Sequence, residues 1–325
     1  MRVGIDIGGT KTVGVLLRDD QDHDAAAFGP DSSTAVGAAA GEVAQTFRMP
    51  TGHGNAEVTA TALTVIDELL RASGLPASAV TSIGVGVPGV VDADSGEVSH
   101  AVNLGVTRLP LRHELARHFA ARITVENDVN AAAVGVWHLL GDPTIASMAY
   151  LNLGTGLAAG LVLDGRLRRG ARGTAGEIGH IPVEPGGPLC ACGQHGCLEL
   201  SASGAAIARL WPGSGPRDLA RLMTAAEAGD PVALSARATL VENIAAAVRL
   251  LVLTVDVDVV VIGGGMITQG SPLITAVRGV LDEWGTRSAF IDSLGLSARV
   301  RYAPSASALA AIGAAHLAVD PVVRA

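Results

Sequence analysis

Two stretches of this chain share an unusual pattern, in which a very short glycine turn joins two apolar strands. The first covers residues 3–17, with the turn at residues 8–9, and the second covers residues 149–163, with the turn at residues 154–156. A turn this short favours antiparallel pairing of the two flanking strands as a hairpin. Because the same unit recurs, we expect two related α/β domains, each beginning with such a hairpin.

The composition is that of a well-packed globular protein. The chain has 325 residues, enough for two domains, and its charged fraction is 17% with a mean hydropathy of +0.40. A net charge of −8, with no basic cluster, argues against a nucleic-acid partner. The most apolar run is broken by Asp256 and Asp258, so no membrane span is expected. The N-terminus lacks the segments of a signal peptide, which predicts a cytoplasmic protein.

Elsewhere, strand and helix patterns alternate, as in α/β proteins. We expect a small α/β domain over residues 1–121 and a large α/β domain over residues 122–306, with a C-terminal helix within 307–325 that packs back on the small domain. Residues 19–44 are rich in Asp, Ala, Ser and Gly and predict a long hairpin tip or an insertion. Helices are expected over residues 56–72, 110–120, 129–140, 202–228, 231–254, 273–284 and 308–318, and further strands over 46–50, 82–87, 123–126 and 257–262.

All three cysteines of the chain lie within one short segment. They are Cys190, Cys192 and Cys197, and Gly193 and Gly196 allow a backbone tight enough to direct three sulfurs to one centre. Cysteines so close in sequence make poor disulfides, and one thiol would be left over. The spacing therefore predicts a metal site, with Zn²⁺ as the ion that thiolates favour. The alternative is a small buried thiol cluster without a metal.

Two histidines compete to be the fourth zinc ligand. His195 lies inside the short loop between Cys192 and Cys197, whereas His180 precedes the cluster by ten residues. We favour His180, because it can approach from a separate segment of the chain. Four protein ligands would complete the tetrahedron, so the zinc is expected to be structural.

Three glycine turns follow buried strands and are candidates for binding phosphate groups. Turns without side chains let backbone N–H groups close around phosphate oxygens, although glycine is also common in ordinary tight turns. None of them fits the Walker or dinucleotide-binding pattern. The turns are Gly8, Gly9 and Thr10; Gly154, Thr155 and Gly156; and Gly263, Gly264 and Gly265. Asp6, beside the first turn, is either a carboxylate that holds Mg²⁺ through water or one that caps the turn.

Four polar residues could act on a substrate, and each has an ordinary structural alternative. Asn127 and Asp128 precede a predicted helix, so either could cap it, or Asp128 could accept a proton from a hydroxyl while Asn127 binds another. Glu177 and Glu199 flank the cysteine segment. They are either solvated surface residues or carboxylates that accept hydrogen bonds from sugar hydroxyls.

Four motifs give the chain a clear resemblance. GIDIGGTK, ENDVNAA, LNLGTGLAAGLVLDGRLRRGARGTAGEIGH and CACGQHGCLE together resemble the ROK family of bacterial sugar kinases, over nearly the whole chain. The resemblance implies an actin-like, ribonuclease H-like fold of two α/β domains, with nucleotide and sugar bound in the cleft between the domains. It also implies a homodimer or homotetramer.

The resemblance further implies a role for each matching residue. Asp128 would be the catalytic base, and Gly8 to Lys11 would belong to the nucleotide loops, as would the other two glycine turns. The sugar would be contacted by Asn103, Asn127, Glu177, His180 and Glu199, and zinc would be held by His180, Cys190, Cys192 and Cys197.

The activity that the resemblance implies is transfer of the γ-phosphoryl group of ATP to the primary hydroxyl of a hexose, with Mg²⁺, and glucose is the predicted sugar. This chain reads NLGVTRLPL where glucokinases of the family commonly read NLPGW, which weakens the choice of sugar. N-acylhexosamines, fructose, mannose and cyclitols are the alternatives. A sugar-sensing regulator is disfavoured, because no helix-turn-helix precedes the first predicted strand.

Overall fold

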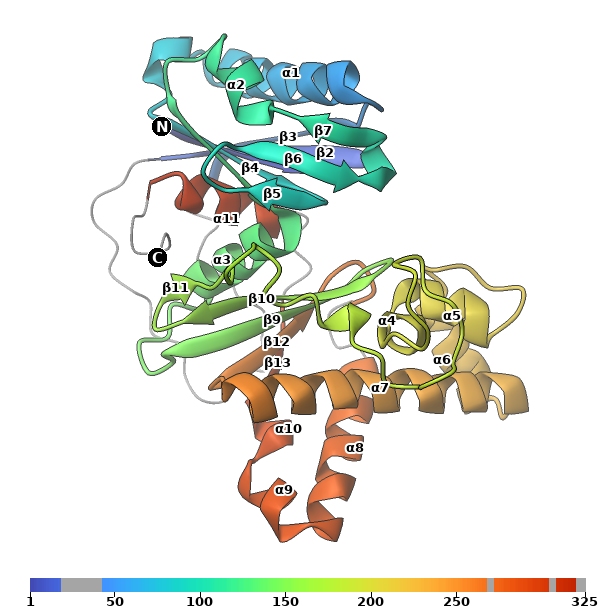
Figure 1. Cartoon of the computed structure of the whole chain (residues 1–325). Coiled ribbons are helices and arrows are strands. Elements are labelled where there is room, and N and C mark those ends of the chain that lie inside the picture. Colours follow the sequence, from blue (N-terminus) through green and yellow to red (C-terminus); the bar gives the residue numbers. More distant parts are fainter. Residues whose placement is uncertain (19–42, 268–271, 304–307, 320–325) are drawn as a thin grey trace. The chain divides into compact units, whose positions relative to one another are not determined.

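The computed structural model describes residues 1–18, 43–267, 272–303 and 308–319, and the predicted insertion at 19–44 lies almost wholly outside them. It divides into two compact units. The first holds residues up to Thr144, Gly160–Ala175 and the C-terminal helix α11 (Leu309–Leu317); the second holds Ile145–Ala159 and the chain from Gly176 through the last strand. Each unit is an α/β structure, as predicted (Figure 1).

The first unit is built on a five-stranded sheet with the order β3-β2-β1-β4-β8. β3, β2 and β1 pair antiparallel to one another, whereas β1, β4 and β8 are parallel neighbours. The strands are β1 (Arg2–Ile7), β2 (Lys11–Leu17), β3 (Val43–Pro50), β4 (Ser82–Val87) and β8 (Arg122–Asn127). The first predicted glycine hairpin is thus present as β1 and β2.

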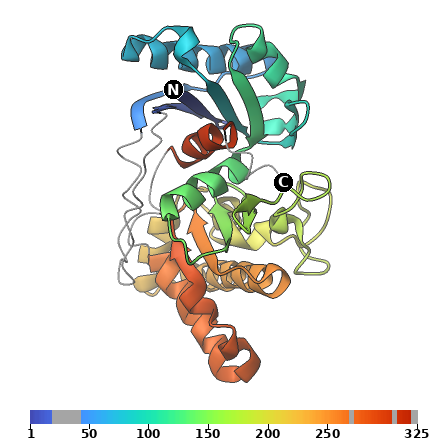
Figure 2. The same ribbon diagram turned by 90° about the vertical axis from the view of Figure 1, so that its left-hand side faces the viewer.

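Helices cover both faces of this sheet: α1 (Asn55–Ser73) on one and α11 on the other (Figure 1 and Figure 2). α11 lies unusually close to the strands. A Cβ atom at Gly4 would lie 1.9 Å from the carbonyl oxygen of Ala311, and one at Gly84 would lie 1.7 Å from that of Ala314. Only glycine at these two strand positions permits the helix backbone to approach so closely.

A small antiparallel sheet, β5 (Val90–Asp92), β6 (Glu97–Ala101) and β7 (Val106–Leu109), also belongs to the first unit. Its short strands lie in a segment whose turn residues concealed them in the sequence. A single 3₁₀ turn, η3 (Val102–Leu104), connects β6 to β7 and carries Asn103. The helix predicted over 110–120 is shorter, α2 (Leu111–Ala116), and the other 3₁₀ turn here is η2 (Ala77–Ala79).

The domain boundary predicted after residue 121 differs from the observed division. β8 pairs in parallel with β4, and α3 (Asp128–Leu140) packs against α11. A Cβ atom at Gly313 of α11 would lie 1.8 Å from the carbonyl oxygen of Ala131, so these two helices also meet through backbone. Residues 122–144 therefore group with the N-terminal part of the chain.

The second sheet has the order β11-β10-β9-β12-β13. Its strands are β9 (Ser147–Leu153), β10 (Leu157–Leu163), β11 (Arg166–Leu167), β12 (Val259–Gly263) and β13 (Val300–Tyr302). β12 is parallel to both β9 and β13. The second predicted glycine hairpin is β9 and β10, and the boundary between the two units crosses β10.

The helices of the second unit are η4 (Ile178–His180), α4 (Glu199–Ala202), α5 (Gly204–Leu210), α6 (Leu219–Glu227), α7 (Pro231–Val255), α8 (Pro272–Arg287), α9 (Ala289–Ser293) and α10 (Leu296–Arg299). The stretch predicted as helical over 202–228 is divided, because Pro212, Gly213 and Pro216 interrupt it. α7 is the one described helix long and apolar enough to cross a membrane. It contacts α6, α8 and α4, as a core helix does.

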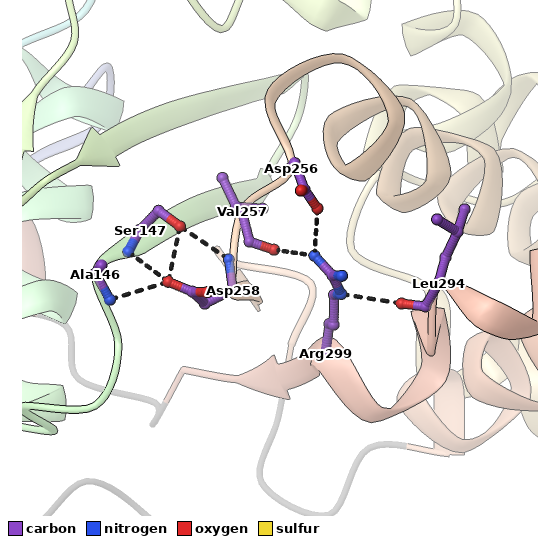
Figure 3. A network of polar contacts seen from close by, with 7 residues as sticks. All are labelled: Ala146, Ser147, Asp256, Val257, Asp258, Leu294 and Arg299. Carbon is purple, nitrogen blue, oxygen red and sulfur yellow. Dashed lines mark hydrogen bonds and ion pairs between the residues drawn. The ribbon is translucent and has the colours of Figure 1, made fainter.

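One polar network links the start of β9 to the start of β12 in the second sheet (Figure 3). The Asp258 carboxylate accepts hydrogen bonds from the backbone N–H groups of Ala146 (2.9 Å) and Ser147 (2.8 Å) and from the Ser147 hydroxyl (2.8 Å). These bonds, led by that of the Ser147 hydroxyl, hold the pKa of Asp258 below its usual range. Arg299 donates 2.8 Å hydrogen bonds to the Asp256 carboxylate and to the Val257 carbonyl oxygen, which links α10 to the start of β12.

Candidate functional site

In the first unit, the glycine turn between β1 and β2 lies against the segment that carries Asn103. The turn closes through a 3.0 Å hydrogen bond from the N–H of Gly8 to the carbonyl oxygen of Lys11. A Cβ atom at Gly9 would lie 3.2 Å from the Cβ and 3.7 Å from the carbonyl oxygen of Asn103, so the two segments are in close contact. The structure thus brings the predicted phosphate turn and a predicted sugar ligand together.

Asp6 and Asp128 form a second pair in the first unit. Removal of the Asp6 carboxylate from water, together with the negative charge of Asp128, raises the pKa of Asp6 to about 7, and Lys11 opposes the shift. Two carboxylates that repel each other are a fitting environment for a divalent cation, which would relieve the repulsion.

The raised pKa of Asp6 makes the stability of the chain depend on pH. Between the ordinary aspartate pKa and about 7, the folded chain binds this proton more tightly than the unfolded chain, so stability falls as pH rises through that range. The integrated effect is at most about 4 kcal/mol. We expect Asp6→Asn to unfold at higher urea concentration than the unchanged chain at about pH 8, without divalent cations, and to lose this advantage at about pH 4.

A matched control for this prediction is Asp258→Asn, because the pKa of Asp258 is lowered and not raised. A lowered pKa contributes stability above the unfolded pKa, and this stability is lost as pH falls. Asp258→Asn should therefore be less stable than the unchanged chain at about pH 8. Equal urea midpoints for Asp6→Asn and the unchanged chain at both pH values would contradict the assignment.

Asn127 is the residue that caps α3, where the sequence allowed either Asn127 or Asp128 to do so. Its Oδ1 atom accepts hydrogen bonds from the N–H groups of Val129 (2.9 Å) and Asn130 (3.2 Å), and its Nδ2 atom donates to the Gly89 carbonyl oxygen (3.2 Å). An amide oxygen has two lone pairs, and both are used here. Toward a ligand, Asn127 can therefore act only as a donor, through its second Nδ2 hydrogen.

Asp128 is the first residue of α3 and is half-buried. Its Oδ1 atom accepts a 2.9 Å hydrogen bond from the N–H of Val129. This hydrogen bond holds the Asp128 side chain against the first turn of α3. Its position in the first turn of α3 is one where the helix dipole favours a negative charge.

In the second unit, the other two glycine turns lie side by side. β9 and β12 are parallel neighbours, with Gly263 opposite Asn152, so their following turns come to the same edge of the sheet. A Cβ atom at Gly264 would lie 2.5 Å from the Leu153 carbonyl oxygen, and the φ angle of Gly264 is +97°. Both the space and the backbone conformation thus require glycine at this position.

Glu199 connects the second glycine turn to the cysteine segment. Its carboxylate accepts a 2.9 Å hydrogen bond from the N–H of Leu157, and a Cβ atom at Gly156 would lie 2.5 Å from its Oε2 atom. A Cβ atom at Gly179 would lie 3.4 Å from the Cβ of Glu199. Glu199 is therefore fixed between the turn and the Glu177–His180 segment, which excludes the solvated-surface alternative for this glutamate.

Cys190, Cys192, Cys197 and His180 form one compact cluster. Their possible ligand atoms all lie within 4.8 Å of one another, with 3.6 Å between the sulfurs of Cys192 and Cys197 and 3.9 Å between His180 Nδ1 and the sulfur of Cys190. A tetrahedral Zn²⁺ with bonds of about 2.3 Å to sulfur separates its ligand atoms by about 3.5 to 3.8 Å. The geometry fits a zinc ion with four protein ligands.

The loop around the cluster is shaped as the sequence predicted. Gly193 and Gly196 have φ angles of +90° and +69°, which are left-handed conformations. His195 lies outside the cluster, and its Nδ1 atom is 2.9 Å from the Gly187 carbonyl oxygen. Hydrogen bonds, first that from the backbone N–H of Gln194, lower the pKa of Cys192 to about 6, whereas burial raises the pKa of the neighbouring Cys197 to about 12. A bound cation would favour the thiolate form of Cys197 as well.

Sequence reasoning missed one charged group at this site, Glu126. It is buried, with 3% of its surface exposed, and pairs with Arg169. The available signal was a glutamate that directly follows the β-branched run ITV of β8. Taken by unit, Asp6, Asn103, Asn127 and Asp128 belong to the first unit, whereas Glu177, Glu199 and the cysteine cluster belong to the second.

Fold and sites together define an α/β protein of two units with three glycine turns after buried strands and a Cys₃His cluster. The chain matches the ROK family over residues 2–320. It is 31% identical to a glucokinase of Halalkalibacterium halodurans, over 85% of this chain and 83% of that protein. The chain therefore belongs to the ROK family.

Two solved structures of similar length have the same fold. A ROK hexokinase from Thermus thermophilus has a TM-score of 0.73 at 29% identity and covers 97% of this chain, which spans 96% of that one. A ROK family glucokinase from Streptomyces griseus, in complex with glucose and AMPPNP, has a TM-score of 0.72 at 27% identity, with coverages of 97% and 98%. N-acetylmannosamine kinases and xylose repressors are also among the similar proteins.

Proposed function

We propose that this chain is an ATP-dependent sugar kinase that phosphorylates glucose at its primary hydroxyl. The observation that carries the proposal is its similarity to glucokinases over most of both chains, with Asp128 held at the start of α3. In the reaction, the sugar oxygen attacks the γ-phosphorus as its proton passes to Asp128. The bond from that phosphorus to the bridging oxygen breaks, and ADP leaves.

The remaining site residues bind and orient the two substrates. Asn103, Asn127, Glu177, His180 and Glu199 would contact sugar hydroxyls, and Asn127 would do so as a donor. The turn from Gly8 to Lys11, together with the turns at Gly154 to Gly156 and Gly263 to Gly265, would contact the nucleotide. A Mg²⁺ ion would be held near Asp6, where it would neutralise charge on the phosphate groups.

The zinc ion would have an orienting role. His180 and the three cysteines would hold it, and Glu199 follows Cys197 by only two residues, so fixing the cysteine loop also fixes this carboxylate. Polar groups that are already in place lose little entropy when the sugar binds. A cytoplasmic location and a homodimeric or homotetrameric assembly remain predictions from the sequence.

Variants of Asn127 should separate its capping role from its role toward the sugar. Serine retains an oxygen that can cap α3 but lacks the amide donors, whereas alanine lacks both. We expect Asn127→Ala to be less stable than Asn127→Ser by about 1 kcal/mol. Both should raise the KM for the sugar by roughly 10- to 100-fold, because one buried hydrogen bond to the ligand is lost. A KM for Asn127→Ser equal to that of the unchanged chain would leave Asn127 only its capping role.

The proposed activity is tested by following ADP release with ATP and Mg²⁺ over a panel of sugars. The panel contains glucose, mannose, fructose, N-acetylmannosamine, N-acetylglucosamine and a cyclitol. We expect the highest kcat/KM with glucose. A higher value with another member would change the sugar but keep the kinase, and no turnover with any of them, from folded and zinc-loaded protein, would contradict the kinase itself.

A further inference from the structure

Glu126 is a buried carboxylate to which the proposed reaction assigns no role. It lies near the end of β8, two residues before Asp128, with only 3% of its surface exposed. A carboxylate removed from water in this way is costly unless charged and hydrogen-bonded partners compensate for the lost hydration. Such an arrangement needs an explanation beyond the packing of the strand.

The partners of Glu126 come from three different places in the first unit. Its Oε1 atom accepts hydrogen bonds from the backbone N–H of Asn127 (3.0 Å) and from the Nδ2 atom of Asn130 in α3 (3.0 Å). Its Oε2 atom accepts a 2.6 Å hydrogen bond from Nε of Arg169, which forms a largely buried ion pair. Arg169 itself follows β11 closely, and its carbonyl oxygen accepts from the N–H of Ala175.

These bonds fix the peptide group next to the proposed base. The N–H of Asn127 is held by Glu126, and the Asn127 side chain is held by the first turn of α3. Asp128, as the next residue, has little freedom to rotate its backbone. Proton transfer is sensitive to displacements of the base as small as about 1 Å, which can cost about 100-fold in rate.

We propose that Glu126 and Arg169 are a positioning pair that holds Asp128 in the orientation for proton transfer. This inference rests on the proposed function, in which Asp128 is the base. Arg169 supplies the opposite charge that compensates for burying the Glu126 carboxylate. Glu126, held by Arg169, in turn fixes the backbone N–H of Asn127, the residue before Asp128.

The test is a double-mutant cycle between Arg169 and Asp128, read in kcat. Arg169→Met alone should lower kcat by roughly 10- to 100-fold, with KM values for sugar and ATP within about threefold of the unchanged chain. In an Asp128→Asn background the same change should lower the residual kcat by less than about threefold, because the base that it positions is already lost. An equal loss in both backgrounds would show a merely structural pair and overturn the proposal.

Arg168→Met is the matched control, because Arg168 is the preceding residue and its pair with Asp164, at 3.6 Å, is exposed. It should keep kcat within about threefold. If Arg169→Met does not fold, Glu126→Gln takes its place. Its amide can still accept the Asn127 and Asn130 hydrogen bonds, while its NH₂ group faces the Arg169 donor. The same cycle is then measured with Glu126→Gln. A loss of kcat only in the chain that retains Asp128 supports the pair, and an equal loss of kcat in the Asp128→Asn chain overturns it.

The proposed function and this inference fail in different ways. If the unchanged chain transfers no phosphate to any sugar of the panel, the proposed function fails before the cycle begins. If the unchanged chain is active and Arg169→Met is folded with kcat within about threefold, only the positioning pair fails.

Discussion

Asp128→Asn is expected to lower kcat by roughly 100- to 10,000-fold, while the KM for the sugar changes little. Asparagine has nearly the same shape and can still accept the N–H of Val129, so the start of α3 should remain intact. What it cannot do is accept a proton from the sugar hydroxyl. Steady-state kinetics with ATP and glucose, together with a sugar-binding titration, measure both parts of this expectation.

The same substitution has a second, independent consequence. The charge of Asp128 is one cause of the raised pKa of Asp6, so its removal should lower that pKa and stabilise the chain at neutral pH. A variant that is both inactive and at least as stable as the unchanged chain separates loss of chemistry from loss of fold. Asp67→Asn, which removes an exposed carboxylate from α1, is the control and should change neither property. A near-normal kcat in Asp128→Asn would contradict the role of Asp128 as the base and leave it only a structural role at the start of α3.

Loss of one zinc ligand is the second change with a large expected effect. Cys197 is buried in the cluster, and Cys197→Ser removes one of its three sulfurs. Structural zinc sites contribute on the order of 10 kcal/mol in small zinc-dependent folds, so the loop that holds Glu199 should become disordered. We expect metal content well below one zinc per chain and a KM for the sugar raised by more than about 10-fold.

His195→Ala is the matched control for the zinc site, because His195 lies in the same loop but outside the cluster. It should retain zinc and a nearly normal KM. Elemental analysis of freshly purified protein decides between the two histidines. Zinc retained in full by Cys197→Ser, or lost from His195→Ala but kept by His180→Ala, would contradict the assigned ligands.

Much of the fold followed from local sequence patterns. The two glycine hairpins, the strand at 82–87 and the helices α1, α3, α7 and α8 lie close to their predicted positions, because apolar periodicity is strong there. The three-stranded sheet β5-β6-β7 was not predicted, since each strand is short and its pairing is not visible in sequence. The grouping of residues 122–144 with the N-terminal part also depends on tertiary contacts, such as that of α3 with α11.

The parts of the candidate site that are defined by residue types at close spacing could be predicted from the sequence. The parts that depend on burial and tertiary contacts could not. Cysteine spacing indicated the metal cluster, and it favoured His180, which the structure places beside Cys190. The role of Asn127 as the helix cap needed coordinates, because Asn127 and Asp128 were equivalent candidates by pattern. The Glu126–Arg169 pair joins residues 43 positions apart, and such a pairing has no local signature.

The most direct test of the central claim is the product of the reaction. The purified chain is incubated with ATP, Mg²⁺ and glucose, and the mixture is analysed by mass spectrometry. We expect ADP and a hexose monophosphate to accumulate in equal amounts, with the phosphate on the primary hydroxyl, and both to form at least about 100-fold more slowly with Asp128→Asn. ADP that accumulates with free phosphate and without any sugar phosphate would contradict a sugar kinase.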